Sequence, residues 1–558
     1  MRYLRKLFLC FLLLPLICLV FAAFKGDSRN FLISKYLDVF HAVFRELDMM
    51  YVDTIDVQES IEAGVRAMLL ELDPYTVYYP EDEEEDLKMM LTGKYAGVGA
   101  IIRYHKRCDR VVIAEPYEGM PALNAGLRAG DILLSIDGKD LKGLSVDKVS
   151  ERLRGEAGTT LTVRAKREGV ADSIFEVKLT RANISLPSVP YYTMLSDSVG
   201  YIALNSFTEN CAREVRLALV ELKGKGIKRL VLDLRGNGGG ALSEAVDIAG
   251  LFVPKGTVVV TTRGKIAQAT QSFRTRREPL DAAMPLVVLV DGQSASASEI
   301  VAGAIQDLDR GVVMGRRTYG KGLVQTVREM PYNSSLKLTT GKYYTPSGRC
   351  VQAIDYARRA DDGSVERIPD SLTTVYYTMA GRPVRDGGGI TPDVILQSDS
   401  LPNILFYLAN SDVLLDFSTE YVRLHPTIAP VAEFAISDSL YAAFLTAVKT
   451  SGFTYDRQSE RALAALKELA RFEGYAESAA SEFAALERKL SHDIDHDFRY
   501  FRPRIKDLLA NELVTRYYYQ RGSIEHSLKT DSAVIRARRL LSDELAYRAI
   551  LDGVNYKL

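Results

Sequence analysis

The sequence predicts a multidomain protein in which a mixed α/β core is joined to a β-rich domain and to helical segments near both ends. The chain has 558 residues, which is more than a single hydrophobic core usually serves. Between about residues 186 and 395, short apolar runs typical of buried strands alternate with stretches of helical periodicity. Residues 93–182 instead contain several short strand-like runs separated by glycine turns.

The composition is that of a soluble globular protein, with 47% hydrophobic and 26% charged residues. The formal net charge is −1, which argues against a broad nucleic-acid-binding surface. After the first 26 residues the cysteines are Cys108, Cys211 and Cys350. This odd, sparse set predicts no disulfide framework, although one pair could still form in an oxidising compartment.

Residues 1–26 have the pattern of a signal peptide or a signal anchor. Met1–Lys6 is basic and Leu7–Phe24 is almost wholly apolar. The apolar run is close to the ~20 residues that a membrane span needs, so both interpretations stay open. Cys18 fits a lipoprotein site poorly, because isoleucine precedes it. We therefore expect an exported, periplasmic protein that is either soluble or anchored to the inner membrane.

Residues 27–90 are expected to form a small helical domain, because apolar residues recur there at helical spacing. Examples are Tyr36, Val39, Phe40, Val43 and Phe44, followed by Ile61, Val65, Met68 and Leu69.

Residues 91–183 contain the glycine-rich Tyr95–Ala100 segment, five short strand-like runs and a helix expected at Val146–Leu153. In these features they resemble a PDZ domain. The resemblance implies that Gly97, Val98 and Gly99 form the loop that binds a peptide carboxylate, while the peptide adds a strand to the sheet. The alternative is a glycine-rich hairpin without a ligand.

The catalytic candidates follow a buried strand at Leu286–Val290. Three serines alternate with alanines in Ser294–Ser298, Glu299 then opens an apolar helix, and a lysine lies in the glycine-flanked loop Thr318–Gly322. A serine needs a neighbouring base, but no histidine lies between residues 105 and 425. A lysine can act as the base if burial lowers its pKa.

This segment resembles the catalytic segment of the C-terminal processing peptidases, also called tail-specific proteases. The resemblance covers roughly residues 51–393 and implies a crotonase-like α/β peptidase domain at residues 184–398. It makes Ser296 the nucleophile, Lys321 the general base and Gln325 the residue that orients the lysine. Taken alone, Ser296 and Glu299 would be a helix capping box, and the two interpretations are compatible because a helix N-terminus offers unpaired N–H groups.

A second glycine loop, Arg235–Ala241, follows an apolar strand and precedes a helix. It lacks the lysine and the spacing of a phosphate-binding loop. The family resemblance implies an oxyanion hole in which the backbone of Gly238 or Gly239 acts with that of Ala297. The alternative is a tight turn without a ligand.

Residues 399–558 are expected to form a helical C-terminal domain, where the resemblance fades. His492 and His496 lie four residues apart, but without a further ligand we expect a solvated helix face and no metal site. The apolar C-terminus, Asn555–Leu558, suggests a tail that could dock on a PDZ domain of another copy or be trimmed.

The resemblance implies an exported serine endopeptidase that binds exposed C-terminal tails of proteins and uses no cofactor. Its expected partners are protein substrates, an activating adaptor or a second copy, and the membrane through the N-terminal segment, but no nucleic acid. Two alternatives stay open. One is a noncatalytic PDZ scaffold of the cell envelope, and the other is a protease that is latent until a partner binds.

Overall fold

The computed structural model describes residues 29–169, 173–356, 358–359, 364–397, 401–490 and 493–554. The chain divides into two compact units, with the division between Tyr78 and Tyr79. The predicted export segment lies outside the described residues, as do His492 and the tail at 555–558. Among the residues that are described, no helix is both long enough and apolar enough to span a membrane.

The N-terminal unit is helical, as the periodicity predicts. A helix covers residues 29–50, and α2 (Val57–Leu70) begins after Asp56, whose carboxylate accepts the Glu59 N–H at 2.9 Å. The packing differs from the expected one. The apolar residues of the first helix, which the periodicity predicts to be buried, are largely exposed, and the exposed fraction of Phe40 is 50%. An apolar stripe is buried only against another element, and Leu69 is the buried residue of α2.

The β-rich domain has the strands and the helix that the sequence predicts. Its sheet has the order β3-β4-β5-β7-β8, with β6 beside β5, and β2 pairs separately with β9. The bounds are α3 Glu84–Thr92, β2 Lys94–Gly97, β3 Ala100–His105, β4 Arg110–Pro116, α4 Pro121–Asn124, β5 Ile132–Ile136, β6 Lys139–Asp140, α5 Val146–Leu153, β7 Thr160–Lys166, β8 Ile174–Thr180 and β9 Ala182–Ser185. Strand β3 is thus an edge strand, and α5 lies against it.

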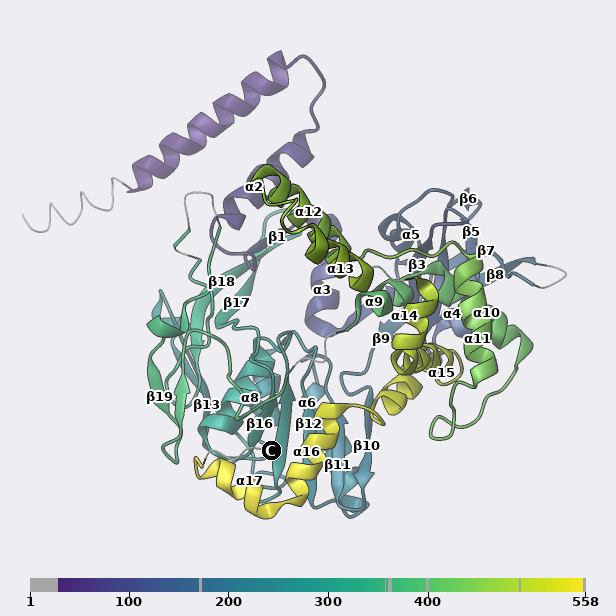
Figure 1. Ribbon diagram of the computed structural model, residues 1–558. Coiled ribbons are helices and arrows are strands. Elements are labelled where there is room, and N and C mark those ends of the chain that lie inside the picture. The colour runs from purple at the N-terminus through teal and green to yellow at the C-terminus, as the bar shows by residue number, and fades with distance from the viewer. Residues whose placement is uncertain are drawn as a thin grey trace, which may run out of the picture. The chain divides into compact units, whose positions relative to one another are not determined.

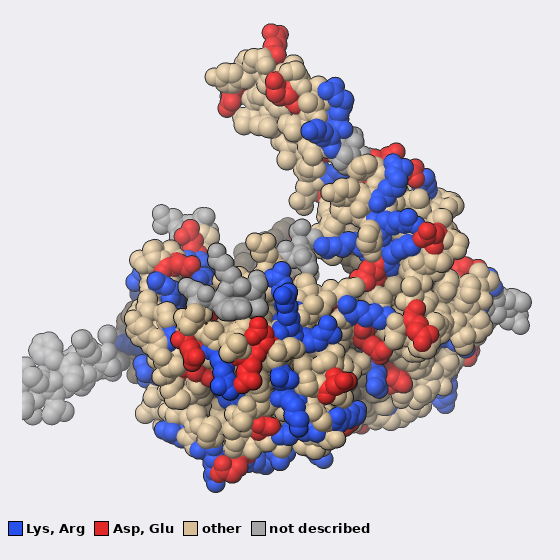
Figure 2. All heavy atoms as spheres, turned by 60° about the horizontal axis from the view of Figure 1, so that its bottom comes forward, with Lys and Arg blue, Asp and Glu red and all other residues tan. Residues whose placement is uncertain are grey.

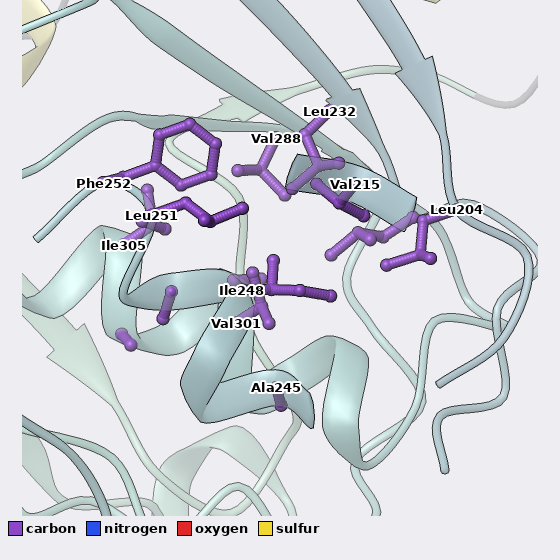
Figure 3. Close-up of a cluster of buried hydrophobic side chains, with 14 of the residues drawn as sticks. Leu204, Val215, Leu232, Ala245, Ile248, Leu251, Phe252, Val288, Val301 and Ile305 are labelled. Atoms are coloured by element: carbon purple, nitrogen blue, oxygen red, sulfur yellow. The ribbon is translucent and has the colours of Figure 1, made fainter. Parts of the chain in front are cut away.

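The α/β core is built on a sheet of order β10-β11-β12-β15-β16-β21, in which every pair except β10–β11 is parallel. Its strands are β10 Tyr191–Ser196, β11 Val199–Ala203, β12 Arg229–Asp233, β15 Leu286–Val290, β16 Val312–Gly315 and β21 Val394–Ile395. Helices α6 (Cys211–Gly224), α7 (Leu242–Ala249) and α8 (Ala297–Asp307) pack on one face. Figure 3 shows Leu232 and Val288 of the sheet meeting Ile248 and Val301 of these helices.

The opposite face of this sheet is covered by the end of the chain. Alternate strand residues such as Val231 and Leu289 point to that face, because successive side chains of a strand alternate. They pack against α16 (Ser532–Ser542) and α17 (Glu544–Leu551), which run beside β12 and β16 (Figure 1). Burial on both faces explains why the central strands are continuous apolar runs.

The other C-terminal helices form a separate core. They are α9 Asn403–Ala409, α10 Asp412–Leu424, α11 Asp438–Thr450, α12 Gln458–Phe472, α13 Ala480–Leu490, α14 Ile494–Tyr500 and α15 Arg502–Ser527. Phe444, Phe498 and Leu513 lie at the centre of this second core. The residues predicted as one helical domain at 399–558 therefore serve two cores, since α16 and α17 belong to the α/β sheet.

A second sheet and two short strands complete the α/β domain. Strand β18 (Ser334–Tyr344) lies between β13 (Val258–Gly264) and β17 (Leu323–Met330), β14 (Gln271–Arg274) pairs with β13, and β19 (Val375–Tyr377) pairs with β20 (Pro383–Arg385). The only described cysteines, Cys108, Cys211 and Cys350, are free thiols.

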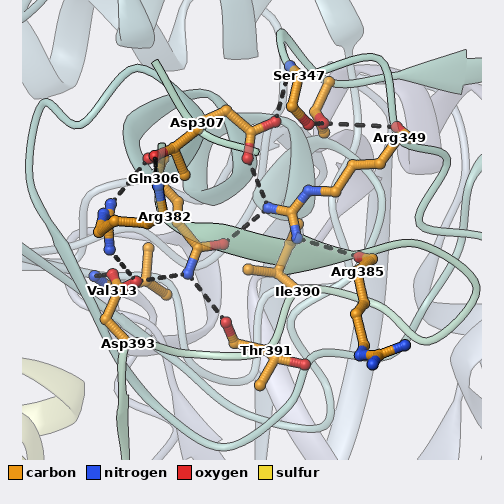
Figure 4. Close-up of polar contacts among 12 residues, drawn as sticks. Gln306, Asp307, Val313, Ser347, Arg349, Arg382, Arg385, Ile390, Thr391 and Asp393 are labelled. Carbon is orange, nitrogen blue, oxygen red and sulfur yellow. Dashed lines mark hydrogen bonds and ion pairs between the residues drawn. The ribbon is translucent and has the colours of Figure 1, made fainter. Parts of the chain in front are cut away.

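A buried polar network fixes the C-terminal end of α8 (Figure 4). The Arg349 guanidinium donates to the Asp307 carboxylate at 2.7 Å, and their side chains are 1% and 0% exposed. Gln306 donates to Asp393 at 2.9 Å. Asp307 therefore has a structural role. On the surface, lysines and arginines are interspersed with acidic residues over the face in Figure 2.

Candidate active site

The serine-rich turn before α8 leaves one hydroxyl group in an accessible position. Ser294 and Ser298 are fully buried, and their hydroxyls donate to the carbonyls of Leu234 at 2.8 Å and Asn237 at 2.9 Å. Ser296 between them is only half-buried. Its backbone has φ 55° and ψ −113°, a conformation that costs energy for a residue with a side chain and is typical of functional sites.

A buried carboxylate joins the serine turn to the lysine loop. Glu299 is fully buried, and its Oε2 accepts the N–H groups of Ser296 and Lys321, both at 2.9 Å. Its Oε1 accepts the Gly320 N–H at 2.8 Å and the Thr318 hydroxyl at 2.5 Å. Burial raises the pKa of the Glu299 carboxyl, while these four donors act in the opposite direction. Glu299 therefore fixes the backbone of the candidate nucleophile relative to that of the candidate base.

The two glycines beside Lys321 are required by close packing. A Cβ atom on Gly320, where φ is +91°, would lie 2.3 Å from the Cβ of Ala353, and one on Gly322 would lie 2.7 Å from the N of Gln352. The Gln352 side chain also accepts the Gly322 N–H at 2.7 Å. The lysine loop is thus held by backbone contacts on both sides, and the Lys321 side chain is half-buried.

Gln325 lies on β17, in the strand that follows the lysine. Its Nε2 donates to the hydroxyl of Thr339 on the paired strand β18 at 3.1 Å. That contact orients the amide. The role predicted for Gln325, to orient Lys321, stays a prediction.

The predicted oxyanion loop lies directly against the serine turn. A Cβ atom on Gly239 would be 2.8 Å from the Cβ of Ser296 and 2.9 Å from the N of Ala297, so only glycine fits there. Asn237 ties the two segments together, because its carbonyl accepts the Ala295 N–H at 3.0 Å. Its side-chain Oδ1 accepts the Gly239 N–H at 2.9 Å, so this amide is already bonded.

The remaining predicted donors have no protein acceptor within the part of the chain that the structure describes. Ala297 is the first residue of α8, where an N–H has no acceptor inside the helix. Among the described residues, no acceptor is found for the N–H of Ala297 or of Gly238. Ala297 therefore offers an unpaired donor next to Ser296, and Gly238 offers one next to Gly239, the residue that lies against the serine turn.

The predicted peptide-binding loop of the β-rich domain precedes the edge strand β3. Val98 is buried, and a Cβ atom on Gly99, where φ is +73°, would lie 2.5 Å from the Cβ of Met120. The carbonyls of Val98 and Gly99 accept the N–H groups of Ala122 at 2.8 Å and Tyr117 at 2.9 Å. The structure therefore brings the loop, the edge strand and α5 together, which is the arrangement that strand addition needs.

Sequence reasoning missed several residues that build the site. Glu299 was recognised only as half of a capping box, although it also holds the lysine loop. Asn237 and Tyr343 were not singled out, and the buried Tyr343 hydroxyl donates to the Ser296 carbonyl at 3.2 Å. A polar residue inside a glycine loop was the available signal for Asn237. Within the described residues no group of acidic, histidine or cysteine side chains could hold a metal ion.

Three regions of the chain match known families. Residues 198–358 match peptidase family S41, residues 112–167 match the PDZ domain, and residues 404–541 match the C-terminal helical domain of probable PDZ-proteases.

Relatives with similar sequences carry protease names. The carboxy-terminal-processing protease of Bartonella bacilliformis is 36% identical over 324 residues, which are 57% of this chain and 73% of that protein. A probable CtpA-like serine protease of Staphylococcus aureus is 34% identical over 330 residues, covering 59% of this chain and 64% of that one. Among solved structures, the photosystem II D1 C-terminal processing protease is 30% identical with a TM-score of 0.36, covering 64% of this chain and 87% of that one.

Proposed function

This chain belongs to the C-terminal processing proteases of peptidase family S41, and we propose that it hydrolyses peptide bonds with a Ser296–Lys321 dyad after binding protein C-terminal tails. The observation that carries the proposal is the position of Glu299. One buried carboxylate holds the backbone N–H groups of both residues at 2.9 Å. The two side chains therefore start from fixed points on neighbouring loops, as a nucleophile and its base require.

In the proposed reaction, Lys321 Nζ accepts the hydroxyl proton as Ser296 Oγ attacks the carbonyl carbon of the scissile peptide bond. Lys321 then returns a proton to the leaving amine, and an ester remains between Ser296 and the substrate. Water hydrolyses this ester, with Lys321 again accepting the proton and Ser296 Oγ recovering it. Gln325 orients the lysine in this scheme. Each transfer requires that Lys321 is neutral when it accepts a proton, so activity should fall at low pH.

The oxyanion that forms during attack is stabilised by backbone amides. The unpaired N–H groups of Ala297 and Gly238 support this role, since Ala297 follows Ser296 and Gly238 precedes Gly239, which lies against the serine turn. A donor of this kind contributes about 3 kcal/mol to lowering the barrier. The Gly239 N–H could join them only after leaving the Asn237 side chain.

Substrate tails are proposed to bind along β3 of the PDZ domain. The edge position of β3 supports this, because an edge strand has unpaired N–H and C=O groups that an extended peptide can complete. The loop at Gly97, Val98 and Gly99 would hold the terminal carboxylate. Specificity for an apolar tail would then come from the surface between β3 and α5.

We also propose that the protein is exported to the periplasm, either as a soluble protein or anchored to the inner membrane through its N-terminal segment. The basic Met1–Lys6 and the apolar run after it support export. Fractionation of cells that produce the full chain, with intact-mass analysis of the N-terminus, tests this. A full-length protein in the cytoplasmic fraction would refute it.

A protease that is latent until a partner binds is the second candidate. The bond between the Gly239 N–H and Asn237 favours it, because that bond occupies one of the predicted oxyanion donors. An activating adaptor or a second copy of the chain would then complete the site. The noncatalytic scaffold has no observation in its favour.

The proposal is tested with the purified full chain and the variants Ser296→Ala and Lys321→Ala. Each is incubated with an unstructured protein that ends in apolar residues, and with a matched protein that ends in two aspartates. We expect the wild type alone to cleave, and to prefer the apolar tail. Cleavage by Ser296→Ala would overturn the assignment of the nucleophile. Cleavage by no form would favour latency, and activity restored by an added partner would then establish it.

A further inference from the structure

The last helices of the chain reach the glycine loop Arg235–Ala241 from the opposite face of the sheet. Helices α16 and α17 pack on the sheet through residues such as Val534 and Leu541. The Tyr547 hydroxyl donates to the Leu286 carbonyl at 3.1 Å and accepts the Leu286 N–H at 3.0 Å. These helices are therefore attached both to β15, which leads to Ser296, and to β12, which leads to the glycine loop.

Asp531 begins this helical pair and performs two functions. Its Oδ1 caps α16 by accepting the N–H groups of Ala533 at 2.9 Å and Val534 at 3.1 Å. The same carboxylate binds the Arg235 guanidinium, with Nη2 donating to Oδ2 at 2.8 Å and Nη1 to Oδ1 at 3.2 Å. The Asp531 side chain is 20% exposed, so this two-point contact is largely shielded from water.

Arg235 is the first residue of the glycine loop and lies between two carboxylates. Its Nε donates to the Asp233 carboxylate at 2.9 Å, and the Tyr201 hydroxyl donates to that carboxylate at 2.8 Å. Although burial lowers it, the two carboxylates raise the pKa of the Arg235 guanidinium above its ordinary value. A permanently charged, planar group held on two sides is a rigid anchor.

The backbone that follows Arg235 has several other attachments before it reaches Ser296, among them the Asn237 amide, which donates to the Leu204 carbonyl at 2.7 Å, and the Gly239 carbonyl, which accepts the Phe207 N–H at 3.0 Å. The Gly236 N–H donates to Asp291 at 3.1 Å, and Asn237 and Gly239 then contact the serine turn. Small displacements here change the oxyanion geometry directly, and a shift of about 1 Å can cost a hundredfold in rate.

We propose that Asp531 is a positioning residue for the reaction: by holding Arg235, the C-terminal helical pair keeps the Gly236–Gly239 backbone in place beside Ser296. This inference rests on the proposed function and assigns a catalytic purpose to the end of the C-terminal extension. It also means that the peptidase site is complete only when α16 is docked on the sheet.

The test compares Asp531→Asn with a matched control, Asp543→Asn, in the full chain. Asp543 caps the next helix by accepting the Ala546 N–H at 3.0 Å, whereas Asp531 also binds Arg235. Asparagine is as good a cap as aspartate, so both variants keep the cap and lose one charge. We measure kcat and KM on one tail-bearing peptide, and amide hydrogen exchange of residues 236–240 by mass spectrometry.

We expect Asp531→Asn to lower kcat about tenfold to a hundredfold with KM within about twofold of the wild type, and to exchange faster at residues 236–240. Asp543→Asn should match the wild type in both measurements. The inference would be overturned by equal kcat values for Asp531→Asn and the wild type, by equal losses of kcat in both variants, or by a change confined to KM. The proposed function is judged separately, and it stands if the wild type cleaves and Ser296→Ala does not. If the wild type does not cleave, hydrogen exchange decides, and equal exchange in the two variants would refute the inference.

Discussion

The two loops that border Ser296 are held in different ways. The lysine loop is bonded to Glu299, which lies in the same domain and only about 20 residues before it in the chain. The glycine loop also has local bonds, such as that of Arg235 to Asp233, but Arg235 is held in addition by Asp531, which is 296 residues away. The lysine loop is therefore anchored within a short stretch, while the glycine loop is anchored in part by the end of the chain.

The two anchors also differ in burial and in the number of donors. Glu299 is fully buried and accepts four hydrogen bonds, whereas the Asp531 side chain is 20% exposed and shares Arg235 with Asp233. Removing an acceptor from buried donors costs about 1–3 kcal/mol for each donor, and a partly exposed pair costs less. We therefore expect the site to be more sensitive to changes at Glu299 than at Asp531.

The largest effect is expected for Glu299→Gln. The amide nitrogen of glutamine would face backbone N–H groups in place of an acceptor, so the serine turn and the lysine loop should separate. We expect kcat to fall at least about a thousandfold, from the combined loss of base and nucleophile alignment. Peptide cleavage is measured at a temperature where the variant is folded by circular dichroism.

The control for this change is Asp307→Asn at the other end of α8. It breaks the buried pair with Arg349, so it should lower the melting temperature, but the folded enzyme should retain most of its kcat. If both variants lose activity only in proportion to their unfolding, Glu299 has no specific role in the site.

Gly239→Ala should have the next largest effect. The added Cβ would lie 2.6 Å from the Ala295 carbonyl and 2.8 Å from the Ser296 Cβ, and φ at this residue is +98°. The glycine loop must move away from the serine, and we expect kcat to fall about a hundredfold. Steady-state cleavage of a tail-bearing peptide measures this.

Gly238→Ala is the matched control, because a Cβ atom there meets no atom within 4 Å and the backbone N–H is kept. It should retain kcat within about threefold of the wild type. Equal losses at both glycines would contradict the close contact that the structure assigns to Gly239 alone.

A smaller effect, a change of thermal stability with pH, is expected where the C-terminal region contacts the PDZ domain. His105 on β3 is buried beside Asp416 at 3.0 Å and Asp412 at 3.6 Å, with Arg103 and Arg107 also paired to these carboxylates. The hydrogen bond with Asp416 raises the pKa of His105 above 6.5, although burial opposes it.

Because the folded-state pKa of His105 is raised, its stabilising contribution is complete below about pH 6.5 and is lost as the pH rises through that raised pKa. Melting temperatures measured from pH 5.5 to pH 9 should show this loss in the wild type and not in His105→Gln. The variant His425→Gln, at an exposed position, should keep the dependence of the wild type. The same pH dependence in His105→Gln would rule out this residue as its source.

What the sequence could predict follows the same difference between contacts that are local in the chain and contacts that are distant. The Ser296 and Lys321 loops could be singled out as candidates because each is a contiguous motif. The multidomain fold class was confirmed, since helical and strand periods are local signals. Asp531 carried no signal, because an ordinary helix cap gives no hint of a partner 296 residues away. The exposed apolar residues near Phe40 could not be foreseen either, since periodicity shows a stripe but not what covers it.

The most direct test of a Ser296–Lys321 dyad is to label the full chain with a fluorophosphonate, which reacts with an activated serine hydroxyl, and to locate the adduct by tandem mass spectrometry. We expect an adduct on Ser296 in the wild type, because Ser294 and Ser298 are buried and donate to carbonyls, and none in Lys321→Ala, because the base is missing. An adduct on another serine, or equal labelling of Ser296 without Lys321, would contradict it.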